Sequence, residues 1–204
     1  MKFLKSFFTV TFLCAGLMLT QQSCDDCNNV DCQNGGTCDA GDCSCPTGFT
    51  GDECETDLCA SVTCLNGGVT APIATDCGCD CSAATGYEGD DCNTEMRAKF
   101  IGTYTVAESC GANSATFAVT NTNSASDITR ILMSDFADVF NSPVVITVDG
   151  NNLTIPDQEP DGDGFRLTGT GTTTDNGSTF NLSYTVNNTN NNTTFNCTAV
   201  FTKQ

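Results

Sequence analysis

The sequence contains no histidine and no tryptophan, and only 7 of its 204 residues are Lys or Arg. Without histidine, the chain cannot build a Ser-His-Asp triad, a Cys-His dyad or an imidazole metal site. The 25 Asp and Glu residues leave a formal net charge of −18. Nucleic-acid binding depends on clustered Lys and Arg that neutralise phosphates, so we expect no nucleic-acid partner. These absences favour a protein that is not an enzyme.

Charge and cysteine divide the chain into two compositional halves. No basic residue lies between Lys5 and Arg97, whereas residues 24–95 carry 15 acidic side chains. Residues 96–204 carry 10 acidic and 5 basic side chains, and only two of the 16 cysteines, Cys110 and Cys197. A division of this kind predicts at least two kinds of domain.

Residues 1–23 have the pattern of a secretory signal peptide. Lys2 and Lys5 come before an apolar stretch over residues 7–19, and the small residue Ser23 comes last. This stretch is too short for a bilayer-spanning helix, which needs ~20 apolar residues.

The segment around Cys24 resembles the relaxed lipoprotein signals of the Bacteroidetes group, in which an acidic pair such as Asp25-Asp26 follows the cysteine. The resemblance implies that Cys24 is acylated and that residues 24–26 form a lipid-anchor region on the outer membrane or cell surface. Its acyl chains would hold the protein on the lipid bilayer. The alternative is an ordinary signal peptide and a soluble extracellular protein.

The number of cysteines bears on the same question. Removal of Cys14 with the signal leaves 15 cysteines, an odd number for an oxidising compartment. A lipid on Cys24 leaves 14, which corresponds to seven disulfides.

Residues 27–55 resemble an EGF-like module in six cysteine spacings and in the segments Asn34-Gly35-Gly36 and Gly48-Phe49. Six cysteines permit 15 connectivities, among which spacing alone does not choose. The resemblance implies the pairs Cys27–Cys38, Cys32–Cys43 and Cys45–Cys54. So short a segment cannot bury an adequate core, and crosslinks at ~2–4 kcal/mol each take its place.

Residues 56–94 repeat the pattern with an atypical spacing. The third cysteine, expected near Thr70, stands at Cys77. The pairing order of the first module, carried over, implies the pairs Cys59–Cys77, Cys64–Cys79 and Cys81–Cys92.

Some EGF-like modules bind Ca²⁺ through acidic residues just before their first cysteine. Glu55 and Asp57 stand there, but Leu58 occupies a position where the pattern has Glu or Gln. Ca²⁺ takes six to eight oxygen ligands, more than this pair supplies. We therefore expect solvated carboxylates and no metal or other cofactor.

Residues 96–204 alternate apolar and polar side chains with period two, as β-strands do. Asp149-Gly150 and Asn176-Gly177 lie between apolar runs and predict hairpin turns. About eight strands with short connections, and one helical turn within residues 134–140, predict an antiparallel up-and-down barrel. A two-sheet β-sandwich is the alternative.

The two remaining cysteines favour the barrel. Cys110 follows the first predicted strand and Cys197 lies in the last, and these strands are neighbours in a closed meander. A Cys110–Cys197 disulfide would stabilise the closure by about 4.5 kcal/mol. The region resembles the lipocalin-like β domains of bacterial surface lipoproteins in its opening Phe100-x-Gly102-x-Tyr104-x-Val106-x-Glu108-x-Cys110 and its closing Cys197-x-Ala199-x-Phe201.

Two functions follow from this organisation. The first is a non-catalytic cell-surface lipoprotein, in which an EGF-like stalk presents a β domain for adhesion or for binding a protein or glycan. The second is a lipocalin-like carrier or sensor of a small apolar ligand. The strands are rich in Phe and branched aliphatic residues that would fill the lumen, and no inward His, Trp or paired charge marks a pocket. A hydrolase based on Asp135 and Asp138 is disfavoured, because nothing near them in sequence suggests a perturbed pKa.

Overall fold

The computed structural model describes residues 26–73 and 75–204. The signal peptide and the lipidation predicted at Cys24 lie outside these residues. The described residues divide into two compact units, with the boundary between Thr56 and Asp57. Among the described residues, no helix is long and apolar enough to cross a membrane.

The first unit is a small disulfide-bonded module. It contains the short 3-10 helix η1 (Asp26–Asn29) and the strands β1 (Thr37–Asp39), β2 (Asp42–Ser44) and β3 (Phe49–Thr50), and β4 (Thr56–Asp57) lies across the boundary between the units. β1 and β2 form a hairpin in which Cys38 faces Cys43. The disulfides are Cys27–Cys38, Cys32–Cys43 and Cys45–Cys54, the same pairs that the sequence resemblance implies.

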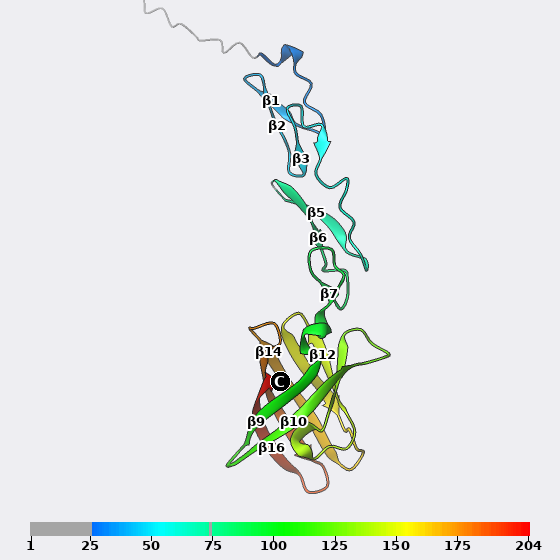
Figure 1. Cartoon of the computed structure of the whole chain (residues 1–204), viewed down its shortest axis with the longest axis vertical. Coiled ribbons are helices and arrows are strands. Elements are labelled where there is room, and N and C mark those ends of the chain that lie inside the picture. Colours follow the sequence, from blue (N-terminus) through cyan, green and yellow to red (C-terminus); the bar gives the residue numbers. More distant parts are fainter. Residues whose placement is uncertain (1–25, 74) are drawn as a thin grey trace, which may run out of the picture. The chain divides into compact units, whose positions relative to one another are not determined.

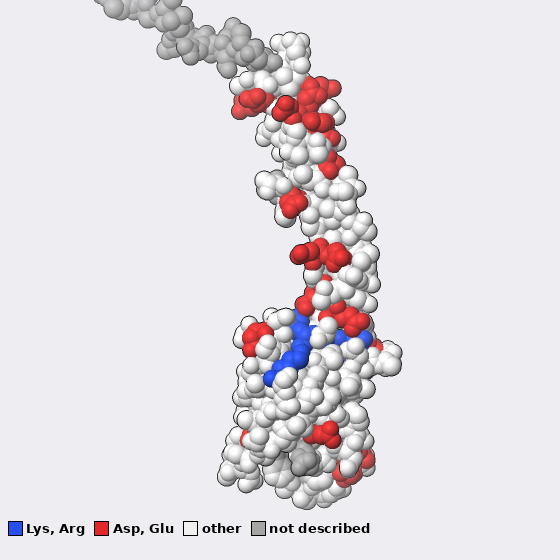
Figure 2. Space-filling model, viewed as in Figure 1, with Lys and Arg blue, Asp and Glu red and all other residues white. Residues whose placement is uncertain are grey.

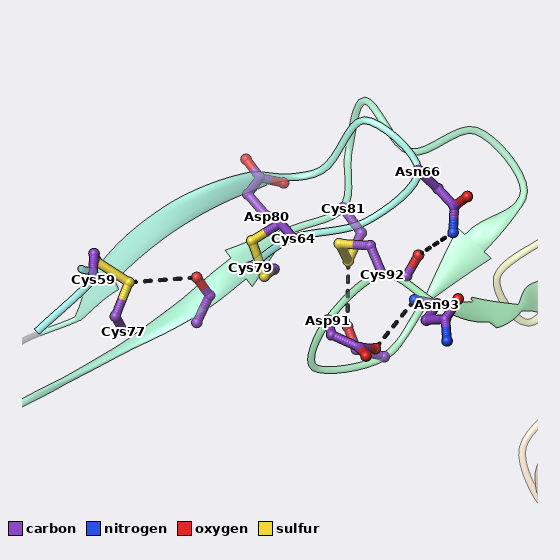
Figure 3. The surroundings of a disulfide bond; sticks show 12 residues. Cys59, Cys64, Asn66, Cys77, Cys79, Asp80, Cys81, Asp91, Cys92 and Asn93 are labelled. Carbon is purple, nitrogen blue, oxygen red and sulfur yellow. Dashed lines mark hydrogen bonds between the residues drawn. A yellow bond between two sulfur atoms is a disulfide. The ribbon is translucent and has the colours of Figure 1, made fainter. Parts of the chain in front are cut away.

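The second unit begins with another disulfide-bonded module. Its strands are β5 (Val69–Ile73), β6 (Asp76–Asp80), β7 (Tyr87–Glu88) and β8 (Thr94–Glu95). Cys77 and Cys79 both lie on β6, so the third cysteine has moved from the first to the second strand of a longer hairpin. The disulfides are Cys59–Cys77, Cys64–Cys79 and Cys81–Cys92 (Figure 3), again the expected pairs.

The Asn-Gly-Gly segments have the same role in both modules. Asn34 and Asn66 take positive φ angles of 52° and 51°, and their Nδ2 atoms donate to the carbonyls of Cys54 and Cys92 at 2.9 and 2.8 Å (Figure 3 shows the second bond). A Cβ on Gly68 would lie 2.5 Å from Sγ of Cys92, so only glycine fits beside this disulfide. The segment therefore holds each hairpin against the last disulfide of its module.

The rest of the second unit is a closed eight-stranded antiparallel barrel (Figure 1), which confirms the predicted up-and-down barrel and excludes the sandwich. Its strands are β9 (Gly102–Cys110), β10 (Asn113–Asn123), β11 (Arg130–Ser134), β12 (Val144–Asp149), β13 (Asn152–Gln158), β14 (Phe165–Thr173), β15 (Thr179–Asn188) and β16 (Thr193–Lys203). Each strand pairs with the next along the chain, and β16 pairs with β9 from Cys197 opposite Cys110 to Lys203 opposite Tyr104. The Cys110–Cys197 disulfide therefore joins the first strand to the last.

Aromatic side chains pack against one another and against Val, Ile, Leu and Met side chains in the barrel lumen. Phe180 stacks on Phe201 with ring centroids 4.4 Å apart, and Phe100 and Tyr104 meet Phe180 edge to face at 5.7 and 5.0 Å. Phe136 continues the series beyond Phe201. It reaches the lumen from η3 (Phe136–Asp138), a short 3-10 turn within the region where the sequence predicts one helical turn.

Two aromatic residues lie outside the buried middle part of the barrel strands. Phe100 is not part of the first strand but ends the 3-10 helix η2 (Met96–Phe100), and β9 begins two residues later at Gly102, whose φ is 130°. Phe195 continues the inward alternation of β16 but is 48 % exposed, since it lies at the rim where the lumen opens.

Candidate functional site

The two ends of the barrel differ in what covers them. We call the end of the barrel next to η2 the anchored end; its connections between strands lie in residues 124–129, 149–151 and 174–178. We call the opposite end the mouth; its connections between strands are residues 111–112, 135–143, 159–164 and 189–192. The second module joins the barrel at the anchored end through η2 (Figure 1).

Arg97 fixes the chain at the anchored end. Its side chain is 8 % exposed, and Nη1 donates to the carbonyls of Ser124, Asp127 and Arg130 at 2.7, 2.9 and 3.1 Å. Nε pairs with Glu95 at 2.9 Å. A guanidinium suits this position because its planar donors stay charged and bond several acceptors at once. Arg97 thus ties η2 to the β10–β11 loop.

Lys99 and Gly86 connect the second module to the same end. Lys99 Nζ lies 2.8 Å from Glu88 Oε1 and donates to Asn151 Oδ1 at 3.1 Å, although its side chain is only 7 % exposed. A Cβ on Gly86 would lie 2.8 Å from Cγ2 of Ile128, so the backbone of the module touches the barrel directly. The module and the barrel are joined by packing as well as by covalent linkage.

Most basic side chains of the barrel domain belong to the anchored end. Four of the five, Arg97, Lys99, Arg130 and Lys203, lie there, and Figure 2 shows the Lys and Arg atoms gathered at that end. Arg166 lies nearer the mouth on the outer face of β14 and pairs with Asp157 at 2.6 Å. Within the described residues, each of these five cations contacts an acidic side chain or a backbone carbonyl.

The mouth contains an apolar pocket of about 200 Å³. We call it the mouth pocket; its main lining residues are Glu108, Phe140, Phe165, Tyr184, Val186 and Phe195, and the Cys110–Cys197 disulfide forms part of its wall. Val139, at its edge, is 64 % exposed. Large apolar groups that remain exposed at a concave site are typical of a binding surface.

Glu108 is the charged residue of this pocket. It shares the inward face of β9 with Tyr104 and Val106, and its carboxylate accepts a hydrogen bond from the hydroxyl of Tyr184. Burial raises the pKa of Glu108, since desolvation disfavours the ionised form. Among the described residues, Glu108 has no ion pair with Lys or Arg.

The sequence motif that opens the barrel domain contains Glu108 but does not mark it as a pocket residue. The sequence predicts no inward His, Trp or paired charge at a pocket, and Glu108 is a single inward carboxylate, four residues after Tyr104 and two after Val106 on one alternating strand. That spacing already placed the carboxylate inside the barrel. The pocket around it is not indicated by this spacing, because its other walls come from segments far away in the sequence.

Asp161 connects two mouth loops. Its carboxylate accepts from the backbone N–H groups of Asn141 and Ser142 at 2.9 and 2.7 Å. These bonds lower the pKa of Asp161 because they favour the ionised form, and the bond from Asn141 has the largest effect. Asp161 therefore links the loop of residues 159–164 to the loop of residues 135–143 at the mouth.

The outer wall of the barrel carries a second concave surface. We call it the outer groove; it has a volume of about 600 Å³ and its hydroxyl-bearing lining includes Thr154, Thr168, Thr170, Ser183, Thr185 and Thr198. None of its lining residues is charged. In so acidic a protein, this face is distinguished by its lack of charged residues and its many hydroxyl groups.

The residues considered for Ca²⁺ are engaged in turns. Glu55 accepts from the backbone N–H of Glu53 at 3.0 Å, and Asp57 from that of Cys59 at 2.8 Å. Among the described residues there is no group of three or more His, Cys, Asp or Glu placed to hold a metal ion.

The protein thus combines a disulfide-rich N-terminal region with a closed eight-stranded antiparallel β-barrel. No family model matches the chain. Over 48 residues it is 54 % identical to "Abnormal pharyngeal pumping eat-20" of Caenorhabditis elegans and 52 % identical to the protein of that name from Caenorhabditis briggsae. These stretches cover 21 % of this chain and only 6 % of each relative's length. The likeness and the seven disulfides are together compatible with an EGF-like module.

Among solved structures, the chain is similar to a protein of unknown function from Bacteroides ovatus. The TM-score is 0.35 and the sequence identity 14 %, over 50 % of this chain and 41 % of that one. A likeness of this size carries no argument about function.

Proposed function

We propose that this chain is a non-catalytic cell-surface lipoprotein whose disulfide-rich modules carry a β-barrel for adhesion or for binding a protein or glycan partner. The observation that carries the proposal is the junction at the anchored end. Arg97 and Lys99 use buried charges to hold the second module against the barrel. A joint of this kind maintains the orientation of a presented domain, whereas a flexible linker does not.

Two further features support presentation. The aromatic series from Phe100 to Phe136 and the aliphatic side chains packed with it occupy the lumen, so the barrel offers its outer surface rather than a large cavity. The outer groove supplies a neutral polar face for the partner. Disulfides suit an extracellular location because they persist in oxidising surroundings.

The surface attachment is tested by metabolic labelling with an alkyne fatty acid in bacteria that produce the full chain. We expect label on the wild type, no label on Cys24→Ala, and unchanged label on the matched control Cys14→Ala, since Cys14 lies within the predicted signal. Protease added to intact cells should cleave the labelled protein. Label that persists on Cys24→Ala, or a chain protected from protease, would contradict the proposal.

A second function, carriage of a small apolar ligand, is favoured by the mouth pocket alone. Its volume of about 200 Å³ is below the ~300–1,000 Å³ of drug-sized sites. Native mass spectrometry of the disulfide-bonded chain tests it, with a bound small molecule as the expected result. Chain that is always empty, including after incubation with apolar compounds, would exclude the carrier function.

A further inference from the structure

We propose that the mouth pocket binds a small apolar amine, whose ammonium group pairs with the carboxylate of Glu108 while its hydrocarbon part lies against Phe140, Phe165 and Val186. The proposal rests on the carrier function, the second of the two proposed above, and it names the class of ligand. It does not depend on surface anchoring.

The first argument is the uncompensated carboxylate. Glu108 faces inward, and within the described residues Tyr184 supplies its one side-chain hydrogen bond and no Lys or Arg pairs with it. An ionised group in apolar surroundings is costly unless it is paired. The nearest basic residue along the pocket-lining strands, Arg166, points to the outer face of β14 and is already paired with Asp157 and Glu159. A ligand cation supplies the missing partner.

The second argument is the nature of the walls. Apart from Glu108, the pocket presents apolar and aromatic groups, including Phe140, Phe165 and Phe195. Aromatic faces attract an ammonium through the ring quadrupole, and aliphatic side chains such as Val186 bury a hydrocarbon chain. The same walls exclude a divalent metal, which needs several oxygen ligands.

Size and charge narrow the class further. A volume of about 200 Å³ equals ~7 water molecules at ~30 Å³ each, which suits an alkyl or aryl group of about six carbons with one amine. The net charge of −18 attracts cations and repels anions. A fatty acid of the same length would place a second carboxylate beside Glu108, so the pocket selects against it.

The test is calorimetric titration of the disulfide-bonded chain with hexylamine and with the neutral analogue 1-hexanol. We expect hexylamine to bind about tenfold more tightly, since a charge-assisted contact is stronger than a neutral one. In Glu108→Gln, hexylamine affinity should fall about tenfold, to the level of hexanol, while hexanol affinity stays within about twofold. The matched control is Asp149→Asn, which removes one negative charge from an exposed site at the anchored end and should change neither affinity.

The outcomes separate the two proposals. Equal binding of hexylamine and hexanol to the wild type, with no effect of Glu108→Gln, would overturn the amine selectivity and leave the carrier function in place. Binding of neither compound would overturn both. Hexanol binding by Glu108→Gln also reports that the pocket of the variant is intact, so loss of amine affinity is not mistaken for unfolding.

Discussion

The two ends of the barrel treat buried charge in opposite ways. At the anchored end, Arg97 and Lys99 are almost completely buried, and every contact that compensates them comes from the chain itself. At the mouth, Glu108 faces inward with one hydroxyl partner and no cation among the described residues. At the anchored end, contacts within the protein therefore offset the cost of removing the charges from water. At the mouth, only solvent or a bound ligand can offset the rest of that cost. The anchored end is thus held by its own charged contacts, whereas the mouth keeps an inward carboxylate without a cation, which is the basis of the amine site proposed above.

The largest change in stability is expected when the disulfide that closes the barrel at the mouth is removed. Replacing Cys110 and Cys197 together by Ala should lower the free energy of unfolding by about 4.5 kcal/mol, because the disulfide closes a loop of 87 residues. Urea unfolding followed by tyrosine fluorescence measures it. Ser109 and Thr198 are an exposed opposing pair one position along the same strands, and their double Ala variant is the control. An equally small loss in both variants would mean that the hydrogen-bonded β16–β9 ladder suffices to close the barrel.

The next effect concerns the anchored end. Arg97→Gln should lower the free energy of unfolding by about 3 kcal/mol, because three backbone carbonyls lose a charged donor. Hydrogen exchange in residues 124–130 should become faster, since that loop loses its attachment to η2. Arg166→Gln, which removes an exposed arginine paired with Asp157, should leave the unfolding midpoint near that of the wild type. If the two variants behaved alike, Arg97 would not be the anchor of this end.

A smaller effect is expected from the buried hydroxyl at the anchored end. Tyr104 donates to the carbonyl of Gly177 at 2.9 Å, so Tyr104→Phe should cost about 1 kcal/mol. Burial first, and then the charge of Asp175, raise the pKa of Tyr104 to about 12.

The sign of the pH dependence follows from this shift. The contribution of Tyr104 is fully present below its unfolded pKa of about 10 and is lost as the pH rises toward about 12. The alkaline loss of stability should therefore be smaller in Tyr104→Phe than in the wild type. Tyrosinate absorbance measures the titration directly, and the normal titration of all three tyrosines near pH 10 would contradict the assignment.

The sequence was sufficient to predict the architecture because its signals are local and repeated. Period-two alternation in segments such as residues 180–184 and hairpin turns such as Asn176-Gly177 identify the strands. The position of Cys110 and Cys197 on the first and last strands distinguishes a closed meander from a sandwich. Each of these features depends on neighbours along the chain or on two residues whose strands must meet.

The candidate sites were harder to predict, because they depend on contacts between distant segments. Nothing in the neighbourhood of Arg97 indicates that its three acceptors are 27, 30 and 33 residues away. The mouth pocket likewise requires residues from β9, β14, β15 and β16 and from the loop that carries Phe140 to converge. The period-two alternation of β9 predicts that Glu108 faces inward, but it does not predict a pocket around this residue.

The smallest change in stability is expected from Glu108→Gln, which removes the unpaired carboxylate of the mouth. The pKa of folded Glu108 is raised by burial, so the protonated group favours the folded state, and that contribution is lost as the pH rises through the raised value. Glu108→Gln should therefore be slightly more stable than the wild type at pH 7, by a fraction of ~1 kcal/mol because the pocket is open to solvent, and equal to it below pH ~4.

Asp161, at the same rim, has the opposite shift. Its pKa is lowered by the N–H groups of Asn141 and Ser142, so its contribution is present above pH ~4 and is lost as the pH falls through the lowered value. Asp161→Asn should consequently be less stable than the wild type at pH 7, the reverse of Glu108→Gln. Thermal unfolding of both variants from pH 3 to 8 compares the two windows. Loss of stability at neutral pH in both would mean that Glu108 is a structural acid like Asp161, and that the mouth does not hold an uncompensated charge.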